Sequence, residues 1–240
     1  MHTSSRLKTT DFTWQRIVPS GPVDSDFSTL FPDYHPQDRI GIVSPQLEDG
    51  ILHAGGLLLA LTTAFYDVCR ASGPTFFDYP QHLAFLGGDQ TGVYTASGEI
   101  LTNRDEWSAA WGWLDVWPEG NWIIVPPHPV ELLERIEQLH INRLLWPESL
   151  VHTPPDRLLP AYARRLLASR LKSVWLYDSP APDVELRLSP VAATLMAESV
   201  ARLPGPPVCA NQPGALDTFR YRIVETEAFL TDRAACFEPT

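Results

Sequence analysis

Acidic and histidine side chains follow three short apolar runs of the sequence, at points where strands would end. Glu48 and Asp49 follow the first run, His128 the second and Asp178 the third. In open α/β sheets ligands bind beyond the carboxyl ends of the strands, so these side chains would meet at one edge if the three strands are parallel and adjacent. Carboxylates with an imidazole suit a divalent metal or general acid–base chemistry. The alternative is that they are solvated loop residues.

In residues 40–58 an apolar run is followed by the loop Pro45-Gln46-Leu47-Glu48-Asp49-Gly50 and then by a glycine-containing segment. This pattern resembles the N-terminal segment of the PIG-L-type zinc-dependent N-acetylglucosaminyl deacetylases, which has an apolar strand, a His-Pro-Asp-Asp-Glu loop and a glycine-containing helix start. The resemblance implies that Asp49 stands at the metal-ligand aspartate and Glu48 at the catalytic aspartate. Gln46 replaces the ligand histidine, and a neutral amide is a poor zinc ligand. On this hypothesis zinc or another divalent metal is the cofactor, with Asp49 and His128 as its ligands.

A tryptophan cluster is the other unusual feature. Five of the eight tryptophans fall within sixteen positions, and they are Trp107, Trp111, Trp113, Trp117 and Trp122. Trp107 and Trp111 are four residues apart and share a helix face. Aromatic side chains at this density stack on sugars or bases, or anchor protein interfaces. The alternative is that they pack in the core. Acidic residues surround the cluster, which favours a protein or a neutral ligand over nucleic acid.

Charge and composition exclude several classes of protein. The 240 residues carry a formal net charge of -11. Residues 1–120 hold 6 basic and 15 acidic residues, net -9, which leaves 12 and 14, net -2, for the rest. Binding through a nucleic-acid backbone needs clustered Lys and Arg, so it is not expected here, and neither is an anionic membrane surface. The longest uncharged apolar stretch, 51–66, is shorter than a membrane span. Three scattered cysteines favour a reducing compartment, and we predict a soluble cytoplasmic protein.

Hydrophobic periodicity and turn residues predict alternating strands and helices. The predicted strands are 39–43, 82–86, 122–125, 173–177, 184–188 and 219–224, and the predicted helices are 51–72, 104–114, 130–140, 156–171 and 190–203. The expected fold is α/β and layered, with a largely parallel sheet flanked by helices and some antiparallel hairpin strands. Residues 1–38 are expected to form an irregular N-terminal arm and residues 39–240 a single α/β domain. A boundary inside that domain, if there is one, falls near 147–155.

Two functions from different classes follow from these patterns. The favoured one is a non-catalytic module that binds a protein or a small ligand through an acidic, Trp-rich surface. Its predicted binding residues are Trp107, Trp111, Trp113, Trp117 and Asp178. A protein partner or a second copy of the chain is expected, with no nucleic acid and no membrane. The alternative is a divalent-metal-dependent amide hydrolase or deacetylase, with Glu48 as the catalytic residue.

Overall fold

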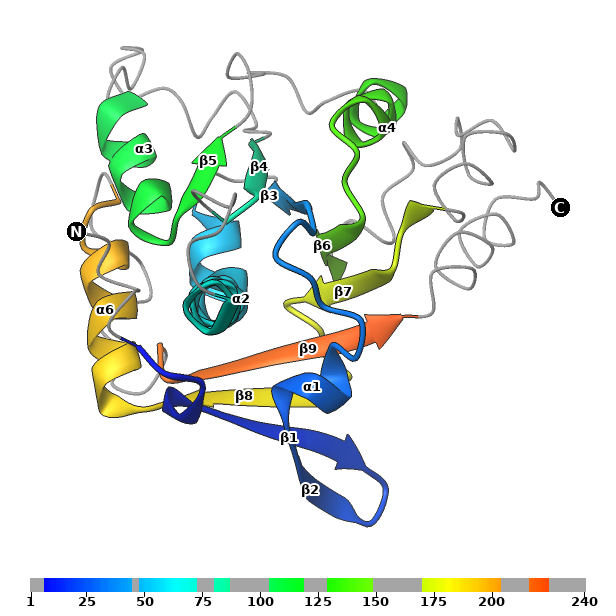
Figure 1. Cartoon of the computed structure of the whole chain (residues 1–240), viewed down its shortest axis with the longest axis vertical. Helices are drawn as coiled ribbons and strands as arrows, with labels where there is room; N and C mark the ends of the chain where they lie inside the picture. The colour runs from blue at the N-terminus through cyan, green and yellow to red at the C-terminus, as the bar shows by residue number, and fades with distance from the viewer. Residues whose placement is uncertain are drawn as a thin grey trace, which may run out of the picture.

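A single nine-stranded sheet organises the chain (Figure 1). The computed structural model describes residues 7–44, 48–72, 80–86, 104–118, 129–148, 170–203 and 216–224. The strands are β1 (Phe12–Val18), β2 (Gly21–Ser25), β3 (Ile40–Ser44), β4 (His82–Leu86), β5 (Val116–Pro118), β6 (Arg143–Pro147), β7 (Ser173–Tyr177), β8 (Val184–Leu188) and β9 (Thr218–Val224). The helices are α1 (Phe27–Leu30), α2 (Asp49–Ser72), α3 (Arg104–Trp113), α4 (Pro129–Gln138) and α6 (Pro190–Val200), with a 3₁₀ turn η2 (Thr9–Asp11).

The sheet is parallel in one half and antiparallel in the other. Its order is β2-β1-β8-β9-β7-β6-β3-β4-β5, and all pairings from β7 to β5 are parallel. The pairings from β7 to β2 are all antiparallel. The predicted α/β class with flanking helices is confirmed, whereas a largely parallel sheet describes only one half. The connections explain the difference: two residues join β1 to β2 and permit only an antiparallel pair, while β3 reaches β4 through α2.

The central helix, α2, forms the core together with α3 and α6. Its buried positions include Leu57, Leu58 and Phe65, and it packs with α6 residues such as Met196 over one face of the sheet. A smaller apolar cluster around Ile136 of α4 covers the other face. By length and composition alone α2 would pass for a membrane span, but 72% of its most apolar window is buried in the fold. Its lack of charge therefore reflects burial on most sides.

The N-terminal segment belongs to the sheet. Where an irregular arm is predicted for 1–38, residues 12–25 form a hairpin whose first strand pairs with β8. The alternation of β1 explains this, since Phe12 and Trp14 are buried while Thr13 between them is exposed. Trp14 packs edge-on against Trp175 of β7, with ring centroids 6.3 Å apart. The aromatic residues of this segment thus build core on the sheet itself.

Two of the predicted elements cannot be compared. The predicted strand 122–125 lies outside the described residues, as does the predicted helix 156–171 up to residue 169. The predicted strand 82–86 is confirmed as β4, and it lies between β3 and β5, parallel to both. The strand β6 is an addition that the sequence analysis did not predict, and it separates β3 from β7.

Candidate functional site

The carboxyl edge of the parallel strands is where α2 begins. Ser44 ends β3, and its hydroxyl oxygen accepts a hydrogen bond from the backbone N–H of Gly50 at 2.9 Å. The carbonyl of Glu48 accepts the backbone N–H of Leu52 at 2.9 Å, which starts the helical hydrogen-bond ladder. These two contacts hold the first turn of α2 directly behind the strand. His53, one turn further on, is thereby placed at the sheet edge.

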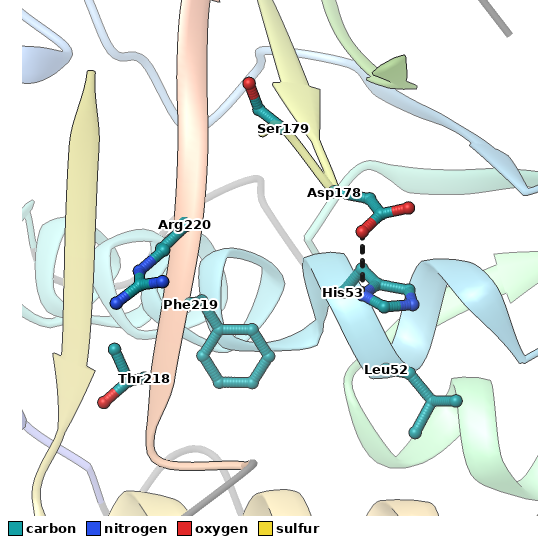
Figure 2. A pocket seen from close by; sticks show the side chains of 7 residues that line it. All are labelled: Leu52, His53, Asp178, Ser179, Thr218, Phe219 and Arg220. Atoms are coloured by element: carbon teal, nitrogen blue, oxygen red, sulfur yellow. Dashed lines mark ion pairs between the residues drawn. The ribbon is translucent and has the colours of Figure 1, made fainter. Parts of the chain in front are cut away.

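His53 faces Asp178 across this edge. The His53 Nδ1 atom lies 3.9 Å from the Asp178 Oδ1 atom, and the two side chains are 38% and 55% exposed (Figure 2). Asp178 directly follows β7 and has a backbone φ of 55°, in the left-handed region that Asp enters more readily than most residues. This conformation turns the chain out of the sheet just after Tyr177. The carboxylate then lies beside the imidazole that α2 supplies.

Tyr177, which directly precedes Asp178, holds the end of β7 in place next to this pair. Its buried hydroxyl donates a hydrogen bond to the carbonyl of Val43, which ties the end of β7 to the end of β3. Burial raises the pKa of the Tyr177 phenol well above its ordinary value, and the charges of Asp49 and Asp178 raise it further. The phenol therefore stays protonated and keeps its hydrogen bond. Because the charge of Asp49 contributes to this raised pKa, its carboxylate lies close enough to the Tyr177 phenol to interact with it electrostatically.

A pocket of about 410 Å³ opens beside the His53–Asp178 pair. Its walls come from α2, from the turn after β7 and from the start of β9 (Figure 2). The lining residues are Leu52, His53, Asp178, Ser179, Thr218, Phe219 and Arg220. A Cβ atom on Gly56 would lie 2.3 Å from the Phe219 ring, so α2 approaches β9 this closely only because residue 56 has no side chain. The Leu57 backbone N–H also donates to the Tyr221 hydroxyl at 3.0 Å.

Of the four acidic and histidine candidates, the structure brings Asp178 and Asp49 to the same edge. Glu48 is partly exposed, and its backbone carbonyl accepts the Leu52 N–H in the first turn of α2. His128 lies outside the described residues. The structure adds His53, which was not among the predicted site residues. Its position one turn inside a helix that opens at a strand's carboxyl end is the sequence signal that could have found it.

The donors that the described residues bring to the pocket do not make up a three-ligand zinc centre. Within the described ranges no group of three or more His, Cys, Asp or Glu side chains is placed to hold a metal ion. His53 and Asp178 provide one nitrogen and one carboxylate, whereas catalytic zinc sites use three protein ligands and a water. Asp49 and His128 as metal ligands stay a prediction.

The tryptophans on α3 are core residues where their side chains are described. Trp111 is fully buried, and a Cβ on Gly50 would lie 2.4 Å from its ring. The Trp113 indole N–H donates to the Leu195 carbonyl at 3.2 Å, and the Arg202 guanidinium stacks 3.8 Å from its ring centroid. These contacts fasten α3 to α2 and α6. The side chains of Trp107 and Trp117 lie outside the described residues, as does Trp122.

Comparison with known proteins gives matches among solved structures alone. No family model matches the chain, and no curated protein does. An A40926 pseudoaglycone deacetylase, Dbv21, is 15% identical, with a TM-score of 0.45 over 79% of this chain and 98% of that one. An N,N'-diacetylchitobiose deacetylase from Pyrococcus horikoshii is 9% identical, with a TM-score of 0.48 over 85% and 95%. A triple mutant of a deacetylase of the teicoplanin biosynthetic pathway is 14% identical, with a TM-score of 0.40 over 68% and 81%.

These findings correct the favoured sequence-based function. All three of these structures are named as deacetylases, whereas the prediction was a non-catalytic module. The surface assumed for that module also fails on physical grounds, because Trp111 is buried and Trp113 is held by Leu195 and Arg202. A protein partner or homo-oligomer stays a prediction.

Proposed function

We propose that this chain is an amide hydrolase of the deacetylase type, with the pocket beside His53 as its active site. The observation that carries the proposal is the pairing of the His53 Nδ1 atom with the Asp178 carboxylate at 3.9 Å on the pocket wall. An imidazole oriented by a carboxylate is the arrangement that general acid–base catalysis uses. Its place beyond the carboxyl ends of parallel strands is where α/β sheets bind ligands.

The two side chains divide the chemistry between them. With Nδ1 directed at Asp178, the Nε2 atom of His53 accepts a proton from a water molecule, whose oxygen attacks the amide carbonyl carbon. Asp178 stabilises the imidazolium that this step forms. The imidazolium then returns its proton to the nitrogen of the leaving amine as the C–N bond breaks, which yields a carboxylic acid and an amine. A group in this role contributes about 10²- to 10⁴-fold to the rate.

The substrate proposed is an acylated amine. The volume of about 410 Å³ suits a small ligand, since such sites commonly enclose about 300–1,000 Å³. The matched structures are named for an N-acetylated disaccharide and for a pseudoaglycone, and we extend only the reaction type, amide hydrolysis, to this chain. We keep the cytoplasm as the proposed location, because Cys69 is a free thiol.

Release of acetate or amine from a panel of acetylated amines, including p-nitroacetanilide, tests the proposal. His53→Gln and Asp178→Asn are expected to lower kcat at least about 100-fold. Asparagine tolerates the left-handed backbone of residue 178, so the second variant removes the charge without straining the turn. His35→Asn, an exposed histidine outside the pocket, serves as the control. Equal rates in all four proteins would remove the assignment.

A chelator separates this mechanism from the zinc hypothesis. Because the described residues supply two donors to the pocket, activity is expected to survive dialysis against EDTA. Loss of activity on dialysis, with recovery on adding zinc, would contradict a mechanism built on His53 alone. It would return Asp49 and His128 as the ligands to test, with Asp49→Ala as the first variant.

A further inference from the structure

Among the described residues, the pocket lies beside a gap in the β-sheet. The strand β9 pairs with β8 along residues 218–221 but with β7 only along residues 221–224. β7 ends at Tyr177, opposite Tyr221, and Asp178 then leaves the plane of the sheet with its positive φ. Among the described residues, positions 218–220 of β9 therefore have a strand on one side only. The side without a strand is the side on which the pocket opens.

The hydrogen-bond alternation of the ladder shows which backbone groups face this gap. In an antiparallel pair, successive residues direct their N–H and C=O groups to opposite sides. The Leu188 N–H donates to the Asp217 carbonyl, and the Asp183 N–H donates to the Tyr221 carbonyl, so odd-numbered positions of β9 bond to the β8 side. Even-numbered positions then bond toward β7, where Arg222 pairs with Leu176.

Thr218 and Arg220 are the two even-numbered positions beyond the end of β7. Their backbone N–H and C=O groups point into the pocket, and no described residue outside the strands hydrogen-bonds to them through its backbone. Unpaired N–H and C=O groups along a strand edge are a template for pairing with another chain, so this edge favours a ligand that carries both groups. Each position presents the donor–acceptor pair that the N–H and C=O groups of one residue of an extended chain complete.

The side chains around the gap point away from the edge of β9 and leave its backbone accessible to a ligand. Figure 2 shows Phe219 and Arg220 projecting away from each other on β9. The Arg220 Nε atom is held by Glu185 at 3.2 Å on the sheet face opposite α2, while Phe219 is buried against α2. Leu52 and His53 close the pocket from the helix. A ligand in the gap thus meets strand edge on one side and the imidazole on the other.

We infer that the pocket takes an extended peptide segment, which adds to the open edge of β9 as a short strand in the place that β7 has left. One residue of the segment donates its N–H to, and accepts with its C=O from, the backbone of Arg220, and the next pairing position is Thr218. At about 3.4 Å per residue the two positions span roughly 7 Å, so two to three residues of the peptide are bound. This inference rests on the proposed function in one respect: the cleaved amide is the one beside His53.

Binding to the His53→Gln protein tests the inference without hydrolysis. The probe is acetyl-tetraalanine amide, and the readout is hydrogen exchange of the Arg220 and Phe219 amides by ¹⁵N NMR. The Arg220 exchange is expected to slow at least about tenfold on saturation, whereas the Phe219 amide, bonded to β8, is unchanged. N-methylation of the peptide is expected to weaken binding about tenfold at alternate residues and little at those between. An unchanged Arg220 amide, or equal loss at every N-methyl position, would overturn the inference.

A matched pair of variants at Thr218 gives a second readout. Thr218→Pro removes the N–H that faces the gap but leaves the β8 ladder intact, and proline is tolerated at the first residue of a strand. It is expected to weaken peptide binding about five- to tenfold, while Thr218→Val, which keeps the N–H, is expected to bind as the parent. Equal affinity of the two variants would count against strand addition.

The two proposals fail in different ways. If the peptide binds with the alternating N-methyl pattern but the parent protein cleaves no amide, the strand-edge site stands and the hydrolase is wrong. If the parent hydrolyses p-nitroacetanilide through His53 but the peptide leaves the Arg220 amide unprotected, the hydrolase stands and peptide recognition is wrong.

Discussion

The two ends of the parallel strands hold their charged side chains in opposite ways. At the amino end, the Arg143 Nε atom lies 2.7 Å from the Asp38 carboxylate, and both side chains are only 3% exposed. At the carboxyl end, His53 and Asp178 lie 3.9 Å apart and are 38% and 55% exposed. The first pair is a closed structural link. The second leaves an imidazole and a carboxylate accessible to a ligand, so the buried pair and the accessible pair lie at opposite ends of the same strands.

The amino end is closed because several segments converge on one buried guanidinium. Arg143 begins β6, and its guanidinium lies 5.6 Å from the Phe31 ring centroid and 5.9 Å from that of Tyr34. Lys172 donates to the second oxygen of Asp38 at 2.8 Å. Burial raises the pKa of the Asp38 carboxyl, but hydrogen bonds from Lys172 and Arg143 outweigh it, so the pKa is lowered overall.

The largest predicted effect is at this end. Asp38→Asn leaves the buried Arg143 guanidinium without its nearest carboxylate, and is expected to lower the free energy of unfolding by about 3–5 kcal/mol. The matched control is Asp33→Asn, which removes a carboxylate 2.8 Å from the same guanidinium but 54% exposed, for less than about 1 kcal/mol. Urea unfolding measures both. Equal losses of stability in the two variants would mean that the burial of Asp38 does not make its ion pair more important than the exposed one of Asp33.

Acid sensitivity is the second prediction, and it also comes from the amino end. His82 begins β4, and burial lowers its pKa from 6.5 to about 3. Below pH 6.5 the unfolded chain binds a proton at His82 that the folded chain does not bind. The free energy of unfolding therefore falls by about 1.4 kcal/mol for each unit that the pH is lowered between about 6.5 and 3. That is about 3 kcal/mol at pH 4.

Unfolding in urea at a series of pH values checks this slope. The hydroxyl of Thr62 donates to the Leu114 carbonyl and so accepts a hydrogen bond from the His82 Nδ1–H at 3.3 Å. The buried Nε2 atom of His82 has no hydrogen-bond partner among the described residues, so a second proton there would be unsatisfied. His82→Leu lacks the titrating group, and its stability is expected to lose this component of the pH dependence. A slope as steep as that of the parent would rule out His82 as its source.

The third prediction concerns the floor of the pocket. Gly56→Ala drives a methyl group into the Phe219 ring, which cannot move aside, and is expected to cost about 1–3 kcal/mol. Gly55→Ala meets the terminal methyl of Met196 at 2.4 Å, and this flexible side chain can shift, while the helix gains from alanine. The neighbouring variants should therefore differ in unfolding free energy by at least about 1 kcal/mol. A loss of stability confined to Gly55→Ala would mean that Met196, and not Phe219, is the neighbour that cannot shift.

The sequence predicts those parts of the fold that depend on local pattern. The buried strand before Ser44, the long apolar helix behind it and the strand before Asp178 are all confirmed. Trp111 was placed on a surface because helical spacing tells which residues share a face but not what that face packs against. Only the fold shows that Gly50 of α2 takes up its ring.

The site was predicted in part for the same reason. Asp178 became a candidate because it follows a strand, and the carboxyl-end rule needs no knowledge of the neighbours. The edge of β9 required the strand order, since β9 comes last in the chain and yet lies beside β7. Where β7 ends relative to Tyr221 is a matter of register, which apolar alternation alone does not give.

The smallest predicted effect on stability falls at the carboxyl end, where the largest effect on activity is expected. His53 and Asp178 are exposed and 3.9 Å apart, so their interaction is screened by water and His53→Gln should change the free energy of unfolding by less than about 0.5 kcal/mol. The same variant should lose at least about 100-fold in kcat. Asp38→Asn is expected to show the converse, with lower stability and, in the folded fraction, unchanged kcat. If His53→Gln lowers the free energy of unfolding as much as Asp38→Asn does, His53 is a structural residue. The proposal that the pocket is the active site would then be wrong.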